Sequence, residues 1–393
     1  MKYFHFRDGR SLEVIVKDHA AKVVEQDSEE TLSFTCRRKF IFKDAVAKLK
    51  RTNSSKLTKP VQVTFLGEAG IDNGGPRREF LELVISEAAR SPLLVGPENS
   101  RSLSHDLVAL DNRSFFHFGQ LIALNLIHGG AGARFFNSLI AKIILYEKYD
   151  AKTIVVEEVP DVDLRKKLQQ LNEICDEAEL VKFVDENLEC RFEMGFTKPS
   201  IFIKLSDKQK IVEYLALNSL VHRSKSELNQ LLEGMSTLGV LDLIRKFPSS
   251  FEKVFSGAPS PMSVDYMTQL FHVDYSPPGS NKRVEEEQII MNWTFLLEES
   301  FEGNIKEKTD VGEMTLSLED IHMIVTGSSQ KPIIGFHHKP RIEFNHSGDG
   351  YLVHANTCAM VIRLPVNKKM LEVKSFVKEI TFCIYNSPGF GCI

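Results

Sequence analysis

The feature that most constrains the fold lies at residues 61–88, where a strand pattern runs through a glycine-rich turn into a helix pattern. In the segment VQVTF (residues 61–65), apolar residues alternate with polar ones, which predicts a half-buried strand. Gly74 and Gly75 permit backbone angles that other residues avoid, and Pro76 suits the first turn of a helix. Apolar residues then follow at helical spacing, at Phe80, Leu81, Leu83, Val84 and Ala88. The segment therefore predicts a strand, a tight turn and a helix in that order.

The glycine-rich turn does not have the spacing of a nucleotide site. A P-loop requires Gly-Lys followed by Ser or Thr, and a dinucleotide-binding turn requires GxGxxG, whereas GEAGIDNGGPRR contains neither. Asp72 and Asn73 resemble part of a calcium loop, but the alternating acidic ligands and the closing glutamate are missing. A tight turn with a helix cap is the favoured interpretation.

The regions on either side of this unit differ in character. Residues 1–60 alternate only weakly and are expected to form an N-terminal extension of unclear fold, with a short basic helix at residues 42–51. Helix patterns follow the unit at residues 115–128, 131–146 and 161–176. Two later helices begin with predicted capping boxes, at Ser206 with Gln209 and at Ser224 with Glu227. The region 61–274 is therefore expected to be mainly helical.

The paired prolines in the segment Tyr275–Ser280 predict a boundary, because they cannot continue a helix and the flanking Gly and Ser favour an exposed connection. We expect a hinge at residues 275–280 and a second unit at residues 281–393. The second unit mixes helix patterns with short strand patterns, at residues 286–301, 318–326 and 368–385 for the helices and 341–344, 351–354 and 359–364 for the strands. The fold class predicted is α+β.

Composition limits the classes of partner. The chain has 49 Lys and Arg against 53 Asp and Glu, a net charge of −4 that gives no bulk electrostatic case for binding nucleic acid or an acidic membrane. No apolar stretch reaches the roughly 20 residues that a membrane span requires. The start, MKYFHFRDGRSLEV, lacks the apolar core of a secretory signal. The six cysteines form no CxxC pair, which favours reduced thiols in a cytoplasmic and/or nuclear location.

One cysteine is distinguished by its position. Cys358 follows the polar segment HANT and precedes the apolar strand pattern AMVIRLP, which could expose its thiol at the mouth of a strand. Its polar neighbours in the sequence are His354, Asn356 and Thr357. An ordinary strand cysteine and a cysteine hydrolase are the alternatives from position alone. The histidines around it, His337, His338, His346 and His354, lack zinc-type spacing, so neither a metal nor a cofactor is expected.

Four ordered motifs resemble those of HECT-type ubiquitin-protein ligases. GEAGIDNGGPRREF resembles the N-lobe signature of that family, and IVTGSSQKPIIGF resembles its FVTG…P..GF stretch. NTCAMVIRLP resembles the segment that carries the catalytic cysteine, and Phe390, fourth from the end, resembles the near-terminal phenylalanine. The resemblance spans about Val61 to the last residue.

The resemblance implies a bilobal HECT fold, in which a large, mainly helical N-lobe and a small mixed α/β C-lobe are joined by a flexible hinge. It implies that Cys358 accepts ubiquitin from a ubiquitin-conjugating enzyme as a thioester and passes it to a substrate lysine. Thr357 takes the place of the threonine before the catalytic cysteine, and Phe390 assists the second step. The implied partners are ubiquitin, protein substrates and a conjugating enzyme that docks around residues 181–214.

Two departures from the family pattern lie beside the cysteine. Asn356 stands where the family usually has histidine, and Ala359 stands where an aromatic residue is common. The acidic C-terminal residue typical of the family is replaced by Ile393. Loss of an imidazole removes a possible base or positive neighbour of the thiol. An alternative function is therefore a catalytically weak or inactive HECT-fold interaction protein that binds a conjugating enzyme or ubiquitin.

Overall fold

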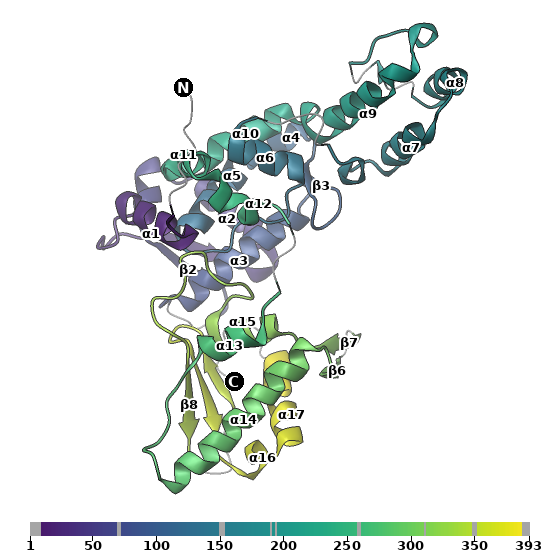
Figure 1. Ribbon diagram of the computed structural model, residues 1–393. Coiled ribbons are helices and arrows are strands. Elements are labelled where there is room, and N and C mark those ends of the chain that lie inside the picture. The colour runs from purple at the N-terminus through teal and green to yellow at the C-terminus, as the bar shows by residue number, and fades with distance from the viewer. Residues whose placement is uncertain are drawn as a thin grey trace.

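The computed structural model describes residues 9–68, 72–148, 154–188, 191–192, 195–257, 261–309, 312–347 and 352–386 (Figure 1). Phe390, which was expected to assist transfer, lies outside the described residues, as do Cys190 and Cys392. The chain folds around two separate hydrophobic cores. We call the parts built on them the N-terminal unit and the C-terminal unit.

The predicted strand, turn and helix at residues 61–88 are confirmed. VQVTF forms strand β2 (Val61–Phe65), which buries every second residue, and the helix is α3 (Gly75–Arg90). Strand β2 pairs in parallel with β1 (Leu32–Cys36), with Leu32 opposite Val61 and Cys36 opposite Phe65. This small sheet packs with α3 in the first core.

Residues 12–58 are an integral part of the N-terminal unit rather than an extension of it. They form α1 (Leu12–Val23), β1, α2 (Ile41–Leu49) and two 3-10 turns, Arg38–Phe40 and Ser54–Thr58. Apolar side chains from α1, β1 and α2 are buried in the same core as β2 and α3. The sequence pattern was weak because each element is short, and β1 buries its apolar face only by pairing with a strand 29 residues further along the chain.

A buried helix, α5 (Ser114–Ile127), lies at the centre of the N-terminal unit, with 12 of its 14 residues buried. It crosses α10 (Lys225–Met235) at close range, because glycines face the partner backbone on both helices. A Cβ atom at Gly119 would lie 2.1 Å from the Leu231 carbonyl oxygen, and one at Gly234 would lie 1.9 Å from that of Phe116. The other elements around it are β3 (Leu94–Val95), β4 (Ser102–Leu103), α4 (Leu107–Asp111), α6 (Ser138–Tyr146), α11 (Val240–Lys246) and α12 (Pro248–Phe255).

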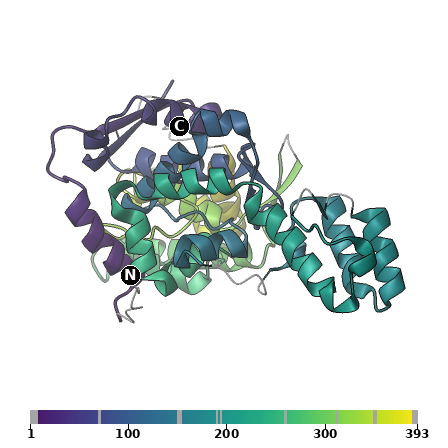
Figure 2. The same ribbon diagram turned by 90° about the horizontal axis from the view of Figure 1, so that it is seen from above.

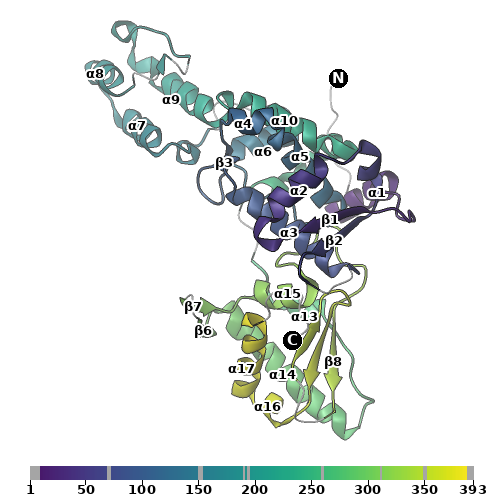
Figure 3. The ribbon, with the colours of Figure 1, turned by 180° about the vertical axis from the view of Figure 1, so that it is seen from behind.

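Three helices project from this body as an arm, as Figure 1, Figure 2 and Figure 3 show. They are α7 (Val162–Glu173), α8 (Glu177–Asn187) and α9 (Lys208–Leu217). A π-helical turn, Asn218–His222, connects α9 to α10. Neither predicted capping box forms: α9 is preceded by Asp207, and the hydroxyl of Ser224 makes no capping bond to α10.

The C-terminal unit contains a four-stranded sheet in the order β5-β8-β10-β9. Strands β5 (His272–Val273), β8 (Arg341–Asn345) and β10 (Val361–Pro365) are parallel, and β9 (His354–Asn356) pairs antiparallel with β10. Ile342, Ile362 and Leu364 share a core with Trp293 and Phe376. The helices are α13 (Val264–Leu270), α14 (Asn281–Phe301), α15 (Leu318–Thr326), α16 (Lys368–Leu371) and α17 (Val373–Tyr385), and a hairpin of β6 (Lys306–Thr309) and β7 (Gly312–Thr315) follows α14.

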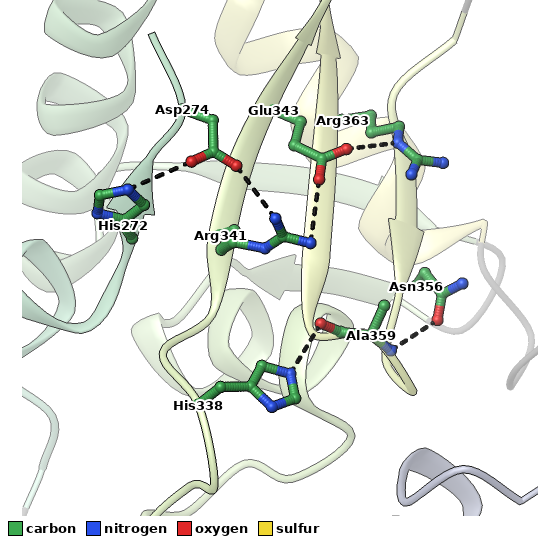
Figure 4. A network of polar contacts seen from close by, with 8 residues as sticks. All are labelled: His272, Asp274, His338, Arg341, Glu343, Asn356, Ala359 and Arg363. Atoms are coloured by element: carbon green, nitrogen blue, oxygen red, sulfur yellow. Dashed lines mark hydrogen bonds and ion pairs between the residues drawn. The ribbon is translucent and has the colours of Figure 1, made fainter.

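The face of this sheet that points away from the core carries a row of ion pairs (Figure 4). Arg341 lies 3.4 Å from Asp274 and 3.3 Å from Glu343, and Arg363 donates to Glu343 at 2.8 Å. Residues 341, 343 and 363 alternate with the buried residues 342, 362 and 364, so charge and apolar surface separate onto the two faces. The sheet therefore has one buried and one solvated face.

The boundary between the cores differs from the predicted hinge at residues 275–280. The first core ends with Phe255, and the second begins with Met262 and includes Met267 and Leu270 of α13. Residues 275–280 connect β5 to α14 inside the C-terminal unit, where Ser276 donates its N–H and hydroxyl to Glu286 at 2.7 and 2.6 Å. Paired prolines mark any break between elements, and here the break is a strand-to-helix loop.

Among the described residues, no helix combines the length and the apolar character that crossing a membrane requires.

Candidate active site

Cys358 lies in a tight turn between β9 and β10, which we call the cysteine turn (residues 356–360). The side chain of Asn356 accepts a hydrogen bond from the N–H of Ala359 at 3.0 Å and so closes the turn (Figure 4). Met360 is buried and has a φ of 51°, a left-handed conformation that few residues other than glycine adopt. Its carbonyl accepts from the N–H of Arg341 at 2.8 Å. The turn is thus held at both ends, with Thr357 and Cys358 half-buried at its tip.

The start of helix α3 in the N-terminal unit packs directly against the cysteine turn. A Cβ atom added at Gly75 would lie 2.5 Å from Thr357 Oγ1 and 3.1 Å from Cys358 Sγ. Only glycine leaves room for this approach. Asp72 shapes the turn before α3, because its carboxylate accepts from the N–H groups of Val63 at 2.9 Å and Gly74 at 2.8 Å.

Arg78 connects α3 to two backbone carbonyls of the C-terminal unit. Its guanidinium donates to the carbonyl of Thr326 at 2.6 Å and to that of Thr357 at 2.5 Å. Burial, with a smaller effect from Arg77, lowers the pKa of Arg78 to about 10, while Cys358 and Asp72 act in the opposite direction. Arg78 therefore stays charged at neutral pH.

Glu82, one turn further along α3, accepts three hydrogen bonds from the C-terminal unit. They come from the Ser328 hydroxyl at 2.7 Å, the Ser329 N–H at 2.7 Å and the Ser329 hydroxyl at 2.5 Å. Ser328 is itself buried, and the other two contacts are only partly exposed. The motifs GGPRREF, VTGSS and NTCAM, which are far apart in the sequence, therefore meet at one place.

The histidines near Cys358 have separate partners. His338 donates from Nε2 to the carbonyl of Ala359 at 3.3 Å, and His346 lies 2.7 Å from Glu286 (Figure 4 shows the former). Burial, together with the charge of Arg77, lowers the pKa of His337. Within the described ranges, no three His, Cys, Asp or Glu side chains are grouped so that they could hold a metal ion.

The structure brings Asn356, Thr357 and Cys358 together in one turn, whereas Phe390 lies outside the described residues. Sequence reasoning identified neither the contact of Arg78 with this turn nor that of Glu82 with Ser328 and Ser329. Both stand in or beside a recognised motif, but their partners lie 246 to 279 residues away in the sequence. Spacing within a motif carries no information about such contacts.

The arm carries exposed apolar side chains in the region where the resemblance implies a docked enzyme. Ile201 is 76% exposed and Phe202 is 60% exposed, far more than most large apolar residues of the chain. We call the exposed set the arm patch: Phe192, Ile201, Phe202, Leu205 and Tyr214. Large apolar side chains that are exposed in one region of a fold are typical of sites of protein interaction.

Comparison with known proteins gives distant similarity to one class of enzyme. The chain is 24% identical over 318 residues to the G2/M phase-specific E3 ubiquitin-protein ligase of Homo sapiens, which covers 81% of this chain and 41% of the relative. It is 26% identical over 270 residues to the protein of the same name from Gallus gallus, which covers 69% of this chain and 34% of that relative. It is 26% identical over 377 residues to the probable E3 ubiquitin-protein ligase hulA of Aspergillus flavus, which covers 90% of this chain and 43% of that relative.

The chain is therefore a distant homologue of E3 ubiquitin-protein ligases over most of its length. It spans less than half the length of these curated relatives. No protein-family model matches the chain.

Proposed function

We propose that the chain is a HECT-type ubiquitin-protein transferase and that Cys358 carries ubiquitin as a thioester. The observation that carries the proposal is the meeting of three separate motifs at the cysteine turn, where Gly75 approaches Thr357 and Cys358 and where Arg78 binds the carbonyls of Thr326 and Thr357. The distant similarity to E3 ubiquitin-protein ligases supports the same class of activity.

The chemistry requires two acyl transfers at one sulfur. The Cys358 thiolate attacks the carbonyl carbon of the thioester on the conjugating enzyme, the old carbon–sulfur bond breaks, and the cysteine of that enzyme leaves as a thiolate. A substrate lysine amine then attacks the new thioester, Cys358 leaves as a thiolate, and the amine loses a proton. Because the first step exchanges similar bonds, positioning contributes more than a strong base.

The partners follow from this proposal. The arm patch would receive the conjugating enzyme, because its exposed aromatic and aliphatic side chains suit the buried centre of a protein interface. Ubiquitin and substrate would approach Cys358 in the C-terminal unit. Movement of one unit relative to the other would bring the sulfur to each partner. A working cysteine that must stay reduced suits the reducing cytoplasm or nucleus.

A second candidate function rests on the contact that Asn356 makes. Its side-chain oxygen closes the cysteine turn through the Ala359 N–H, so the residue at the position of the family histidine serves the backbone of the turn and supplies no proton-transfer group. The alternative is a weak or inactive HECT-fold protein that binds a conjugating enzyme or ubiquitin. Asn356→His separates the two: transfer activity that appears only in the variant favours the binding role.

The test is thioester formation in a purified system. The chain is incubated with activating enzyme, a panel of conjugating enzymes, ATP and ubiquitin, and the products are separated without reductant. A ubiquitin adduct that reductant removes is expected for the native chain and for Cys175→Ala, which removes an exposed cysteine between α7 and α8 of the arm. The adduct is expected to be absent in Cys358→Ala. Absence of an adduct with every conjugating enzyme contradicts the proposal.

A further inference from the structure

The contacts between the two units are concentrated on one face of α3. Gly75, Arg78 and Glu82 are three and four residues apart, so they lie on one side of the helix. Gly75 faces the cysteine turn, Arg78 reaches Thr326 and Thr357, and Glu82 reaches the two serines that follow α15. Each residue uses its side chain, or lack of one, for a contact across the boundary between the units.

Arg78 also donates a hydrogen bond to the C-terminal end of helix α15 in the C-terminal unit. Thr326 is the last residue of α15, and Gly327 ends the helix with a φ of 78°. Carbonyls in the last turn of a helix lack partners within it and carry partial negative charge, so a guanidinium stabilises them. The same guanidinium holds the carbonyl of Thr357, immediately before Cys358. The position of the cysteine turn is thus tied to α3 and α15 together.

The contact between the two units includes charged groups, and bringing the units together costs free energy because Arg78 loses part of its hydration. Among the described residues Arg78 forms no ion pair with a carboxylate, and its side chain is half-buried between the two units. Burial lowers its pKa, because the cation is less well solvated there than in water. The hydrogen bonds to Arg78 and Glu82 can be replaced by bonds to water when the units separate. Ile333 and Ile334 add half-buried apolar contact to the N-terminal core.

Closure restricts the space around the sulfur. A methyl group at Gly75 would already be 3.1 Å from Cys358 Sγ, so no acyl group fits between the sulfur and α3. We infer that Arg78 and Glu82, with their partners Thr326, Thr357, Ser328 and Ser329, form a latch that holds Cys358 against α3 and must open before the thiol reacts with an external acyl donor. The inference deepens the proposed function, on which its biological meaning rests, and concerns how that same site is regulated.

The test measures the reactivity of the Cys358 thiol directly, without ubiquitin. The native chain and its variants are treated with N-ethylmaleimide, and labelling of Cys358 is followed by peptide mass spectrometry relative to the exposed Cys175 in the same molecule. The main variant is Glu82→Ala, because Glu82 contacts the serines and not the cysteine turn. Glu82→Gln, which keeps the size of the side chain, is measured in parallel in case the alanine variant does not fold.

We expect Glu82→Ala to raise the labelling rate of Cys358 about tenfold or more, because it removes hydrogen bonds to a charged group from the closed state. Arg78→Ala is expected to raise it as well, because the closed state loses the hydrogen bonds from Arg78 to the carbonyls of Thr326 and Thr357. Measuring from pH 6 to pH 9 separates access from thiolate fraction: a change in access shifts the rate by the same factor throughout.

The matched control is Glu87→Ala, on the same helix, where the side chain forms an ion pair with the exposed Arg90 and with no other described residue. It is expected to leave Cys358 labelling unchanged. Native labelling rates in Glu82→Ala, Glu82→Gln and Arg78→Ala overturn the latch. Loss of thioester formation with normal latch behaviour instead contradicts the proposed function, so the two failures are distinguishable.

Discussion

Replacing Arg38 with methionine is expected to destabilise the N-terminal unit by leaving a buried carboxylate without its partner. Arg38 donates to both oxygens of Glu79, at 2.6 and 2.9 Å, and also pairs with Glu68. The Glu79 side chain is 6% exposed, and that of Arg38 is 31% exposed. Glu79 is the neighbour of Arg78 on α3, so this pair fixes the helix that meets the cysteine turn.

The magnitude follows from the burial of the two partners. Removing one partner of a fully buried pair costs about 3–5 kcal/mol, and the partial exposure of Arg38 reduces this to about 2–3 kcal/mol. With an m-value of about 2–3 kcal/mol/M in urea, the unfolding midpoint should fall by about 1 M. The molecule contains its own control, because the single tryptophan, Trp293, lies in the C-terminal core. Circular dichroism should report the shift, while Trp293 fluorescence should not.

The loss should also depend on pH. Burial raises the pKa of Glu79 above its ordinary value of 4.5, Arg38 opposes that rise, and the variant removes the opposition. The folded variant then binds a proton that the unfolded chain has released, so its stability falls as pH rises above about 4.5. Arg38→Met combined with Glu79→Gln should recover most of the loss at pH 7.5. A loss below about 0.5 kcal/mol, the size typical of an exposed pair, refutes the reasoning.

Three further outcomes are expected. Substituting Ile201 and Phe202 of the arm patch by serine should weaken binding of a conjugating enzyme at least about tenfold in a calorimetric titration. The circular dichroism should not change, because both side chains are exposed. An unaltered affinity would place the docked enzyme elsewhere on the chain. Asn356→Ala should slow thioester formation several-fold, because the cysteine turn loses a hydrogen bond worth about 1 kcal/mol. Asn356→Asp keeps the acceptor oxygen and should slow thioester formation less. Burial lowers the pKa of His322 from 6.5 to about 4, so acidification from pH 6.5 to pH 4 should destabilise the C-terminal unit by up to about 3 kcal/mol as the unfolded imidazole binds a proton. His322→Gln should remove that part of the pH dependence in urea titrations followed by Trp293 fluorescence.

Local elements with strong periodicity could be predicted from the sequence. Strand β2, the start of α3 and helix α15 lie at or close to the expected residues, because alternation, glycine and helical spacing act within a few residues. The role of residues 12–58 could not be predicted, since β1 becomes a buried strand only beside β2. The boundary between the two cores lies before the predicted hinge, because a pair of prolines indicates a loop but does not indicate whether the elements on its two sides share one core.

The candidate site was predictable in part. The placement of Cys358 beside an apolar strand followed from the sequence, and the structure adds the turn that presents it. The hydrogen bond by which Asn356 closes the cysteine turn could not be predicted, because the pattern indicated only that an imidazole was missing at this position. The contacts of Arg78 and Glu82 depend on how two folded units dock, which no local pattern encodes.

The central claim is that Cys358 accepts ubiquitin, and Cys358→Ser tests it most directly. A serine at this position would trap the acyl group as an oxygen ester, which survives reductant and is cleaved by hydroxide. After incubation with a conjugating enzyme already loaded with ubiquitin, the account predicts a reductant-resistant, base-labile adduct on residue 358 in the variant and a reductant-sensitive one in the native chain. Discharge of the loaded conjugating enzyme with no adduct at residue 358 in either protein would contradict it.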